Sequence, residues 1–196
     1  MDRTSAQALR DLLASTGVVE RTQGFGRSVR RARVGREPGG LLVVGTPTDE
    51  PWHFTAHLRD EAEYAGAPEL TPTLVRWAPP PDAPAHLAVD LRRIEHARRG
   101  ESLLVVAPSI APDPLLERID DARGRGAAVF AVAGDDPELE GLADEALLLD
   151  GSTPAVDFEA MTHLVSLATG EPLQQRGLRS RLARLLDTVA GPRDDS

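Results

Sequence analysis

Two pairs of ionisable side chains stand four residues apart, a spacing that places both members on one face of a helix. The first pair is His53 and His57, followed one turn later by Glu61. Two imidazoles at this spacing can share a metal ion, but such pairs often arise by chance and the middle glutamate of the zinc-protease motif is absent. A structural helix is therefore the favoured interpretation, and no metal site is assigned. A metal-dependent enzyme that uses His53 and His57 stays as an alternative.

The second pair, Glu159 and His163, falls on a helix expected after the last strand. A carboxylate and an imidazole that titrates near neutral pH are the types of group that general acid and base catalysis needs. We therefore name Glu159 and His163 as candidate catalytic residues.

Three loops that follow predicted strands and precede predicted helices are the places where a ligand would bind. Backbone N–H groups and helix dipoles point into such a crevice. Carboxylates in the same loops, among them Asp49 and Glu50, oppose an anionic ligand, and the acids and hydroxyls there can equally cap helices. The predicted ligand-binding residues of the first and second loops are Gly45, Thr46, Thr48 and Ser109.

Short apolar runs alternate along the chain with amphipathic patterns, which is typical of parallel strands connected by covering helices. The sequence therefore predicts an α/β protein with a five-stranded parallel sheet between two helical layers. Trp52 and Trp77 are expected to be core or interface anchors. The expected strands are 41–44, 73–75, 103–106, 128–132 and 146–149, and the expected helices are 4–17, 50–65, 87–99, 112–125, 137–144, 154–169 and 173–190.

The charge divides the 196 residues into three segments. Residues 41–170 carry nine arginines against 23 carboxylates, a net −14, and form the predicted α/β domain. Residues 1–40 form a helical lead-in and an arginine-rich arm, in which 17–40 has a net charge of +4, and residues 171–196 form a helix and an acidic tail. The arm, with its arginines between 21 and 36, is interpreted as a solvated face or tail. Alternatively, it lies across the acidic surface of its own domain or of a second subunit.

The composition excludes several classes of function. All 22 basic residues are arginine, so the chain has no lysine for a Schiff base, for a phosphate-binding P-loop or for a receiver-domain site. The absence of cysteine excludes disulfides and thiolate metal sites. The acidic domain disfavours nucleic acid, and the apolar runs are too short to cross a membrane. With no apolar segment near the start, a cytoplasmic location is expected.

From about Gly39 to Leu149 the sequence resembles the sugar isomerase (SIS) domain family. The likeness rests on the strand and loop Leu103 to Ser109, on the turn Arg125-Gly126-Ala127 and on the step Leu142-Ala143-Asp144 before the last strand. The resemblance implies a parallel sheet of order 2-1-3-4-5, frequent dimerisation, and a phosphosugar site between the first and third strand loops. It also implies that a glutamate and a histidine would act as acid and base in isomerisation.

The phosphosugar loop of that family, Ser-x-Ser-Gly-x-Thr, is altered here to the stretch from Ala107 to Pro112, in which only Ser109 remains. Ile110 resists the backbone conformations that glycine permits, and two prolines remove N–H donors. We therefore predict a non-catalytic dimer, without a cofactor, that binds a carbohydrate derivative or acts as a regulator or scaffold. The alternative is an aldose–ketose phosphosugar isomerase with an atypical loop. The partners expected are a sugar phosphate or sugar derivative, a second copy of the chain, or another protein.

Overall fold

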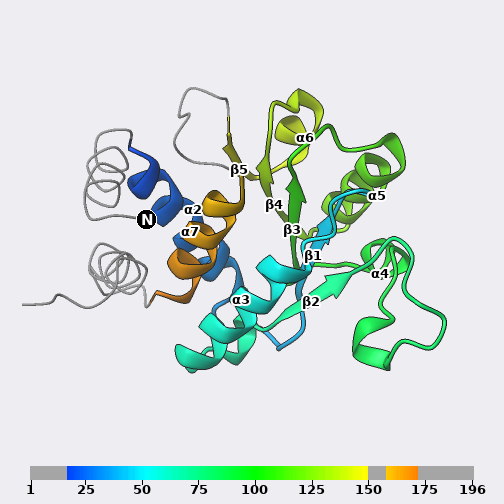
Figure 1. Ribbon diagram of the computed structural model, residues 1–196, viewed down its shortest axis with the longest axis horizontal. Coiled ribbons are helices and arrows are strands. Elements are labelled where there is room, and N and C mark those ends of the chain that lie inside the picture. Colours follow the sequence, from blue (N-terminus) through cyan, green and yellow to red (C-terminus); the bar gives the residue numbers. More distant parts are fainter. Residues whose placement is uncertain (1–16, 150–157, 172–196) are drawn as a thin grey trace, which may run out of the picture.

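The computed structural model describes residues 17–149 and 158–171 (Figure 1). Predictions for residues 4–16, for the helix 173–190 and for the acidic tail lie outside these ranges. The five strands are β1 (Leu41–Gly45), β2 (Pro72–Val75), β3 (Ser102–Ala107), β4 (Ala128–Ala133) and β5 (Glu145–Leu148). The longer helices are α2 (Val18–Arg33), α3 (Trp52–Tyr64), α5 (Asp113–Gly124) and α7 (Phe158–Gly170), and the shorter ones are α4 (Arg92–Glu95) and α6 (Pro137–Leu142).

The five strands form one parallel sheet in the order β2-β1-β3-β4-β5. This order places β1 and β3 side by side in the middle, with Leu41 opposite Ser102 and Gly45 opposite Val106. All residues of β1 and β3 are buried, which explains why these segments are continuous apolar runs rather than alternating ones. The predicted fold class and strand order are confirmed.

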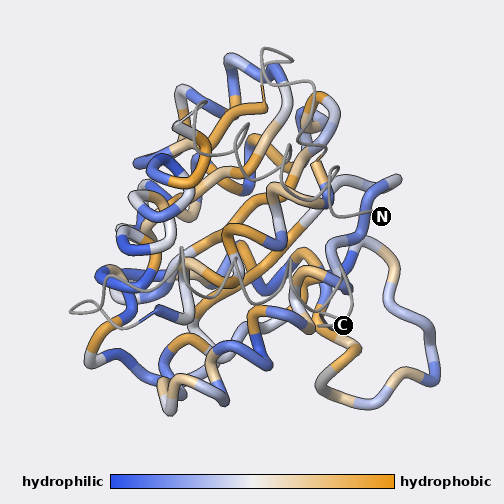
Figure 2. Tube along the Cα trace, turned by 60° about the vertical axis from the view of Figure 1, so that its left-hand side comes forward, coloured by the Kyte–Doolittle hydropathy of each residue, from blue (hydrophilic) through white to orange (hydrophobic). Residues whose placement is uncertain are grey.

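Alternate residues of each strand pack against opposite helical layers. Leu41 and Val43 belong to the core shared with α2, α3 and α7, whereas Leu42 and Val44 belong to the core shared with α4, α5 and α6. The hydrophobic segments accordingly run through the middle of the molecule and the hydrophilic ones around its periphery (Figure 2). The result is a three-layer sandwich in which α3 and α7 pack side by side on one face.

Residues 18–33 differ from the predicted arginine arm, because they form helix α2 of the first layer. Val18, Phe25 and Val29 are almost fully buried, and the Phe25 ring meets that of Phe130 edge-to-face at 6.0 Å between centroids. These apolar residues recur at helical spacing, which the count of charges along the segment concealed. The segment is therefore part of the α/β unit rather than a tail or a strap across the acidic surface, and Arg21, Arg27 and Arg31 form its exposed, solvated face.

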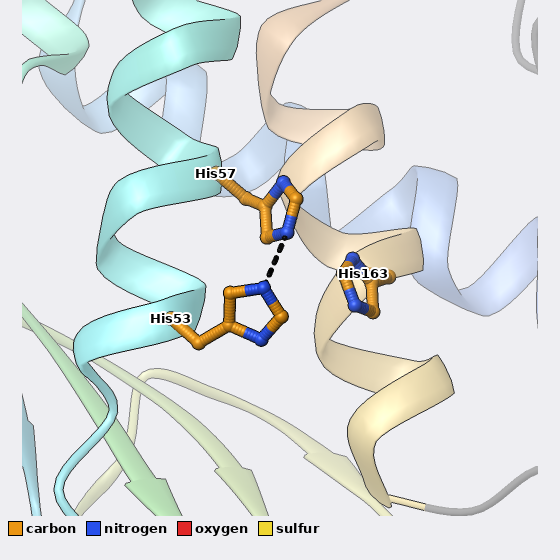
Figure 3. Close-up of side chains that lie close together, drawn as sticks. All are labelled: His53, His57 and His163. Carbon is orange, nitrogen blue, oxygen red and sulfur yellow. Dashed lines mark hydrogen bonds between the residues drawn. The ribbon is translucent and has the colours of Figure 1, made fainter.

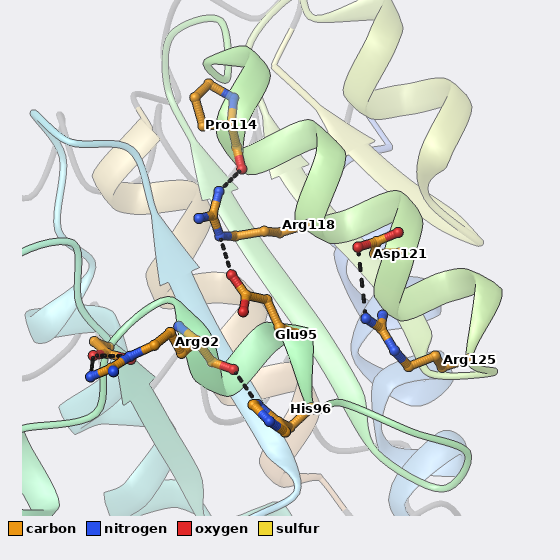
Figure 4. Close-up of polar contacts among 8 residues, drawn as sticks. Arg92, Glu95, His96, Pro114, Arg118, Asp121 and Arg125 are labelled. Carbon is orange, nitrogen blue, oxygen red and sulfur yellow. Dashed lines mark hydrogen bonds and ion pairs between the residues drawn. The ribbon is translucent and has the colours of Figure 1, made fainter.

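The predicted helix 87–99 is also corrected, since only α4 (Arg92–Glu95), after a 3₁₀ turn at Ala85–Leu87, is helical there. The Asp90 carboxylate accepts from the backbone N–H of Arg92 at 3.0 Å, and Asp90 also forms an isolated bridge with Arg76 of the sheet edge. This local bonding holds residues 88–91 out of a helix. Figure 4 shows how Glu95 then links α4 to α5 through Arg118, with Nε to Oε1 at 3.1 Å.

No helix among the described residues is both long and apolar enough to cross a membrane.

Candidate functional site

A cavity of about 420 Å³ opens beyond the carboxyl ends of β1 and β3, between the first turns of α3 and of α7. Both pairs of ionisable residues from the sequence line it, so that His53 and His57 share one site with Glu159 and His163. The remaining lining residues are Asp49, Glu50, Pro51, Phe54, Val106, Pro108, Phe158 and Thr162.

The three imidazoles form a compact cluster (Figure 3). The Nε2 atoms of His53 and His57 are 3.1 Å apart. The His163 ring lies edge-on to both, with centroids 4.4 Å from that of His57 and 5.4 Å from that of His53. One ligand nitrogen from each ring lies within 4.8 Å of the other two. Imidazole nitrogens are common metal ligands, so the three rings are a group that could hold a metal ion.

Glu159 stands at the outer side of this cluster. Its Oε1 atom is 3.8 Å from Nδ1 of His53 and 4.0 Å from Nε2 of His163. The Glu159 side chain is 72% exposed, so water screens its charge and the ion pairs contribute little to folding. A carboxylate in this place is available to a ligand or to a cation held by the imidazoles.

Helices α3 and α7 position the cluster because their apolar faces are fixed in the core. On α3, Phe54 and Leu58 are buried, which leaves the neighbouring positions 53 and 57 facing the cavity. On α7, Met161, Leu164 and Val165 are buried and His163 between them is only half-buried. The histidines thus project from two anchored helices that pack on each other.

The predicted ligand-binding residues of the first loop bond mainly to one another. The Thr46 hydroxyl accepts from the backbone N–H of Asp49 at 3.1 Å and lies 3.0 Å from its Oδ2 atom, and the Thr48 hydroxyl donates to the same Oδ2 at 2.8 Å. Gly45 admits the turn, because a Cβ there would lie 2.0 Å from the carbonyl oxygen of Asp49. Its own carbonyl accepts from Trp77 Nε1 at 2.8 Å.

In the second loop Ser109 and Ile110 are exposed, and neither belongs to the lining of the cavity. Asp136 of the third loop is buried and caps α6 by accepting from the N–H of Leu139 at 3.0 Å. Its other carboxylate oxygen accepts from the N–H of Ala111 in the second loop at 2.8 Å. The capping interpretation is therefore correct for Asp136. Contact of a ligand with Thr46, Thr48 and Ser109 stays a prediction.

The lining of the cavity is electrostatically unfavourable to phosphate. It includes three carboxylates, those of Asp49, Glu50 and Glu159, and no arginine among its described members. Arg76 offsets only Glu50, with which it forms an ion pair at 2.8 Å. A neutral or cationic ligand therefore meets less repulsion here than an anion does.

Trp52 is not a core residue, since it is 64% exposed on the first turn of α3, and its role as an interface anchor stays a prediction. Its ring lies 5.3 Å from that of His53. Trp77 does pack against the core, as expected.

Sequence reasoning found both ionisable pairs but did not place them together. The available signal was the topology. Right-handed crossovers in this strand order put α3 on one face of the sheet and α5 and α6 on the other, and α7 packs on the same face as α3.

Comparison with known proteins places the fold. No family profile matches the sequence, and no curated protein matches it. Among solved structures, the chain is similar to a protein classed as sugar-binding from Salmonella typhimurium LT2, with a TM-score of 0.54, 13% identity and coverage of 92% of this chain and 54% of the other. It is likewise similar to one classed as a phosphosugar isomerase from Silicibacter pomeroyi DSS-3, with a TM-score of 0.54, 16% identity and coverage of 93% and 52%.

These likenesses confirm the SIS-type fold that the sequence predicts. The chain spans about half the length of each of these two proteins.

Proposed function

We propose that this chain binds a carbohydrate derivative, neutral or carrying an amine, in the cavity between α3 and α7, and that it does so without chemical turnover. The observation that carries the proposal is the lining of the cavity, which combines carboxylates and imidazoles with apolar side chains and contains no arginine within the described residues. The fold supports the ligand class, because similar structures are classed as sugar-binding or as phosphosugar isomerases.

The cavity suits a small polar ring in size and in chemistry. Its volume of about 420 Å³ is within the range of small-molecule sites. Asp49, Glu50 and Glu159 can accept hydrogen bonds from hydroxyls or from an ammonium group. Trp52 is not among the lining residues, but its exposed ring lies 5.3 Å from that of His53, where a ligand that extends out of the cavity can rest the C–H face of a sugar ring.

The proposed lack of turnover is supported by the scarcity of anion-binding groups in the cavity. Isomerisation of a phosphosugar needs the substrate held in register, because positioning supplies much of the rate. Thr46 and Thr48 are bonded to Asp49, and the loop after β3 contains Pro108 and Pro112, which lack N–H donors. A phosphate would find few donors and several carboxylates at this edge of the sheet.

The second candidate function is an aldose–ketose phosphosugar isomerase. It is favoured by one observation, namely that Glu159 and His163 both line the cavity in which a sugar would bind. In that case Glu159 and His163 would act as acid and base in moving a proton between sugar carbons.

We further propose that the chain works as a homodimer, as a regulatory or scaffolding unit, in the cytoplasm. Sedimentation of the purified protein gives the mass in solution and checks the dimer. A monomer at concentrations well above micromolar would contradict it.

Calorimetric titration with a panel of amino sugars, neutral sugars and sugar phosphates tests the binding proposal. Amino sugars should bind most tightly and sugar phosphates least. The double change Asp49→Asn and Glu159→Gln conserves volume but removes two charges, and should weaken binding of an amino sugar by about tenfold. Trp52→Ala should weaken neutral and amino sugars alike. Tight binding of a sugar phosphate, with conversion to its isomer that Glu159→Gln abolishes, would contradict the proposal and establish the isomerase instead.

A further inference from the structure

We propose that His53, His57 and His163 form a zinc-binding site in which α3 supplies two ligands and α7 supplies the third. The sequence offered only the pair on α3, which by itself has the spacing of many ordinary helix faces. The additional observation is the third imidazole, which the packing of α7 on α3 brings to the same point.

The distances within the cluster are close to those that a tetrahedral ion requires. Zinc binds imidazole nitrogen at about 2.0–2.1 Å, so two ligand nitrogens on one ion are separated by about 3.3 Å. The Nε2 atoms of His53 and His57 are 3.1 Å apart. The third nitrogen is within 4.8 Å of both, and a rotation of the half-buried His163 side chain, without movement of the helix, can close that gap.

The donor set selects the class of metal. Three neutral imidazoles suit zinc and its transition-metal neighbours, whereas magnesium and calcium prefer oxygen ligands. Zinc is the best match, because three histidines and one open position are a recurrent zinc arrangement and the site has no thiolate to favour softer ions.

The cavity supplies the open position. The cluster lies on its wall, so a water molecule or a ligand oxygen can reach an ion bound there. Glu159, with Oε1 3.8 Å from His53 Nδ1, is placed to orient that imidazole as carboxylates commonly do around zinc, or to serve as a fourth ligand. Its negative charge also favours a cation at this position.

Metal binding does not rest on the proposed carbohydrate function, because the three imidazoles would hold an ion with the cavity otherwise occupied by water. A bound ion would be a point of attachment for a sugar hydroxyl at the wall of the cavity. Its charge would oppose an ammonium group, so the sugar titrations are made on the chelator-treated chain.

The test is calorimetric titration of the chelator-treated chain with zinc chloride alone. We expect one zinc ion per chain and a rise in melting temperature with zinc, since an ion that binds only the folded state stabilises it by mass action. Cobalt(II) at the same site should give the visible absorption of a tetrahedral, nitrogen-ligated ion, and magnesium and calcium should not displace it.

Single substitutions separate the three-ligand site from a simple histidine pair. His163→Ala and His53→Ala should each weaken zinc binding by at least about 100-fold, because each removes a direct ligand. His96→Ala is the matched control, since His96 is an exposed imidazole on another helix terminus and bonds to the carbonyl of Arg92. This control should bind zinc as the parent chain does. His53 is exposed, so its substitution tests the site even if the change at His163 disturbs packing.

Two results would overturn the zinc site. One is the absence of zinc binding by the parent chain at micromolar concentrations. The other is binding that His163→Ala leaves unchanged and His57→Ala removes, which would identify an ordinary pair on α3. Trp52→Ala distinguishes this proposal from the carbohydrate proposal, because it should lose sugar binding and keep zinc binding. A chain that binds zinc and no sugar, or sugar and no zinc, disproves one proposal alone.

Discussion

The two ends of the parallel sheet use their ionisable side chains in opposite ways. At the amino ends of β1 and β3, a polar recess of about 500 Å³ is lined by arginines, among them Arg33, Arg36 and Arg93. At the carboxyl ends, imidazoles and carboxylates line the cavity between α3 and α7. The difference lies in what the groups contact. Arg33, the most deeply buried of these arginines, donates to backbone carbonyls. The three histidines contact one another and line the cavity.

Arg33 shows what the amino end contributes. It is 1% exposed, and its guanidinium donates to the carbonyls of Glu69, Gly100 and Glu37. Burial lowers the pKa of Arg33 below its ordinary value, and Glu101 nearby opposes that shift. A charge so enclosed joins three turns of the chain. The comparison teaches that the buried guanidinium of Arg33 holds the chain together at the amino end, whereas the histidine cluster lines an open cavity at the carboxyl end.

The strongest test of this contrast is Arg33→Met. The change leaves three partly buried carbonyls without their donor, so the free energy of unfolding should fall by about 3 kcal/mol, measured by urea denaturation. Zinc and sugar affinity of the folded variant should not change. The exposed Arg36 is the control, and Arg36→Met should alter stability by no more than about 0.5 kcal/mol. Equal losses for the two variants would contradict a special role for Arg33.

A second substitution examines the first loop at the carboxyl end. In Gly45→Ala the new Cβ would meet the carbonyl oxygen of Asp49 at 2.0 Å, which forces the loop to shift. We expect a loss of about 2 kcal/mol in unfolding free energy together with weaker sugar binding. Gly24→Ala is the control: it lies inside α2 with nothing within 4 Å of the new Cβ, and should stabilise the chain by about 0.5–1 kcal/mol. Unchanged stability of Gly45→Ala would show that the turn is adaptable.

The smallest effect is expected for the histidines themselves. In the zinc-free chain, the triple change of His53, His57 and His163 to Ala should move the unfolding free energy by only about 0.5 kcal/mol, since these side chains are exposed or half-buried. Thermal or urea unfolding in the presence of a chelator measures this. A loss as large as that of Arg33→Met would show that the cluster is a structural element of the fold and would remove the contrast between the two ends.

The sequence predicted those features that depend on local pattern. The central strands β1 and β3 are predicted because they are continuous apolar runs. Gly45, at the end of β1, is predicted to belong to a ligand-binding loop. The structure adds a steric need for glycine at this position, and contact of Gly45 with a ligand stays a prediction. Helix α2 is not predicted, because the net charge of +4 over residues 17–40 conceals the helical period that Phe25 and Val29 carry.

The candidate site could be predicted only in halves. His53 and His57 were visible by their spacing, and so were Glu159 and His163, because spacing along one helix is a local property. Their meeting depends on the packing of α3 against α7, which no local pattern encodes. The predicted helix 87–99 is shortened to α4 for a related reason. Asp90 bonds to the backbone N–H of Arg92 and bridges to the sheet edge, and these contacts compete with helix formation at residues 88–91.

The meeting of α3 and α7 also orders events during synthesis. All five strands are complete before α7 leaves the ribosome, and domains form from the amino terminus onward as the chain emerges. The sheet can therefore assemble while the cavity still lacks one wall. A nascent chain halted before α7 would have His53 and His57 of the cluster but lack His163, so capture of the ion would report that translation has passed that helix.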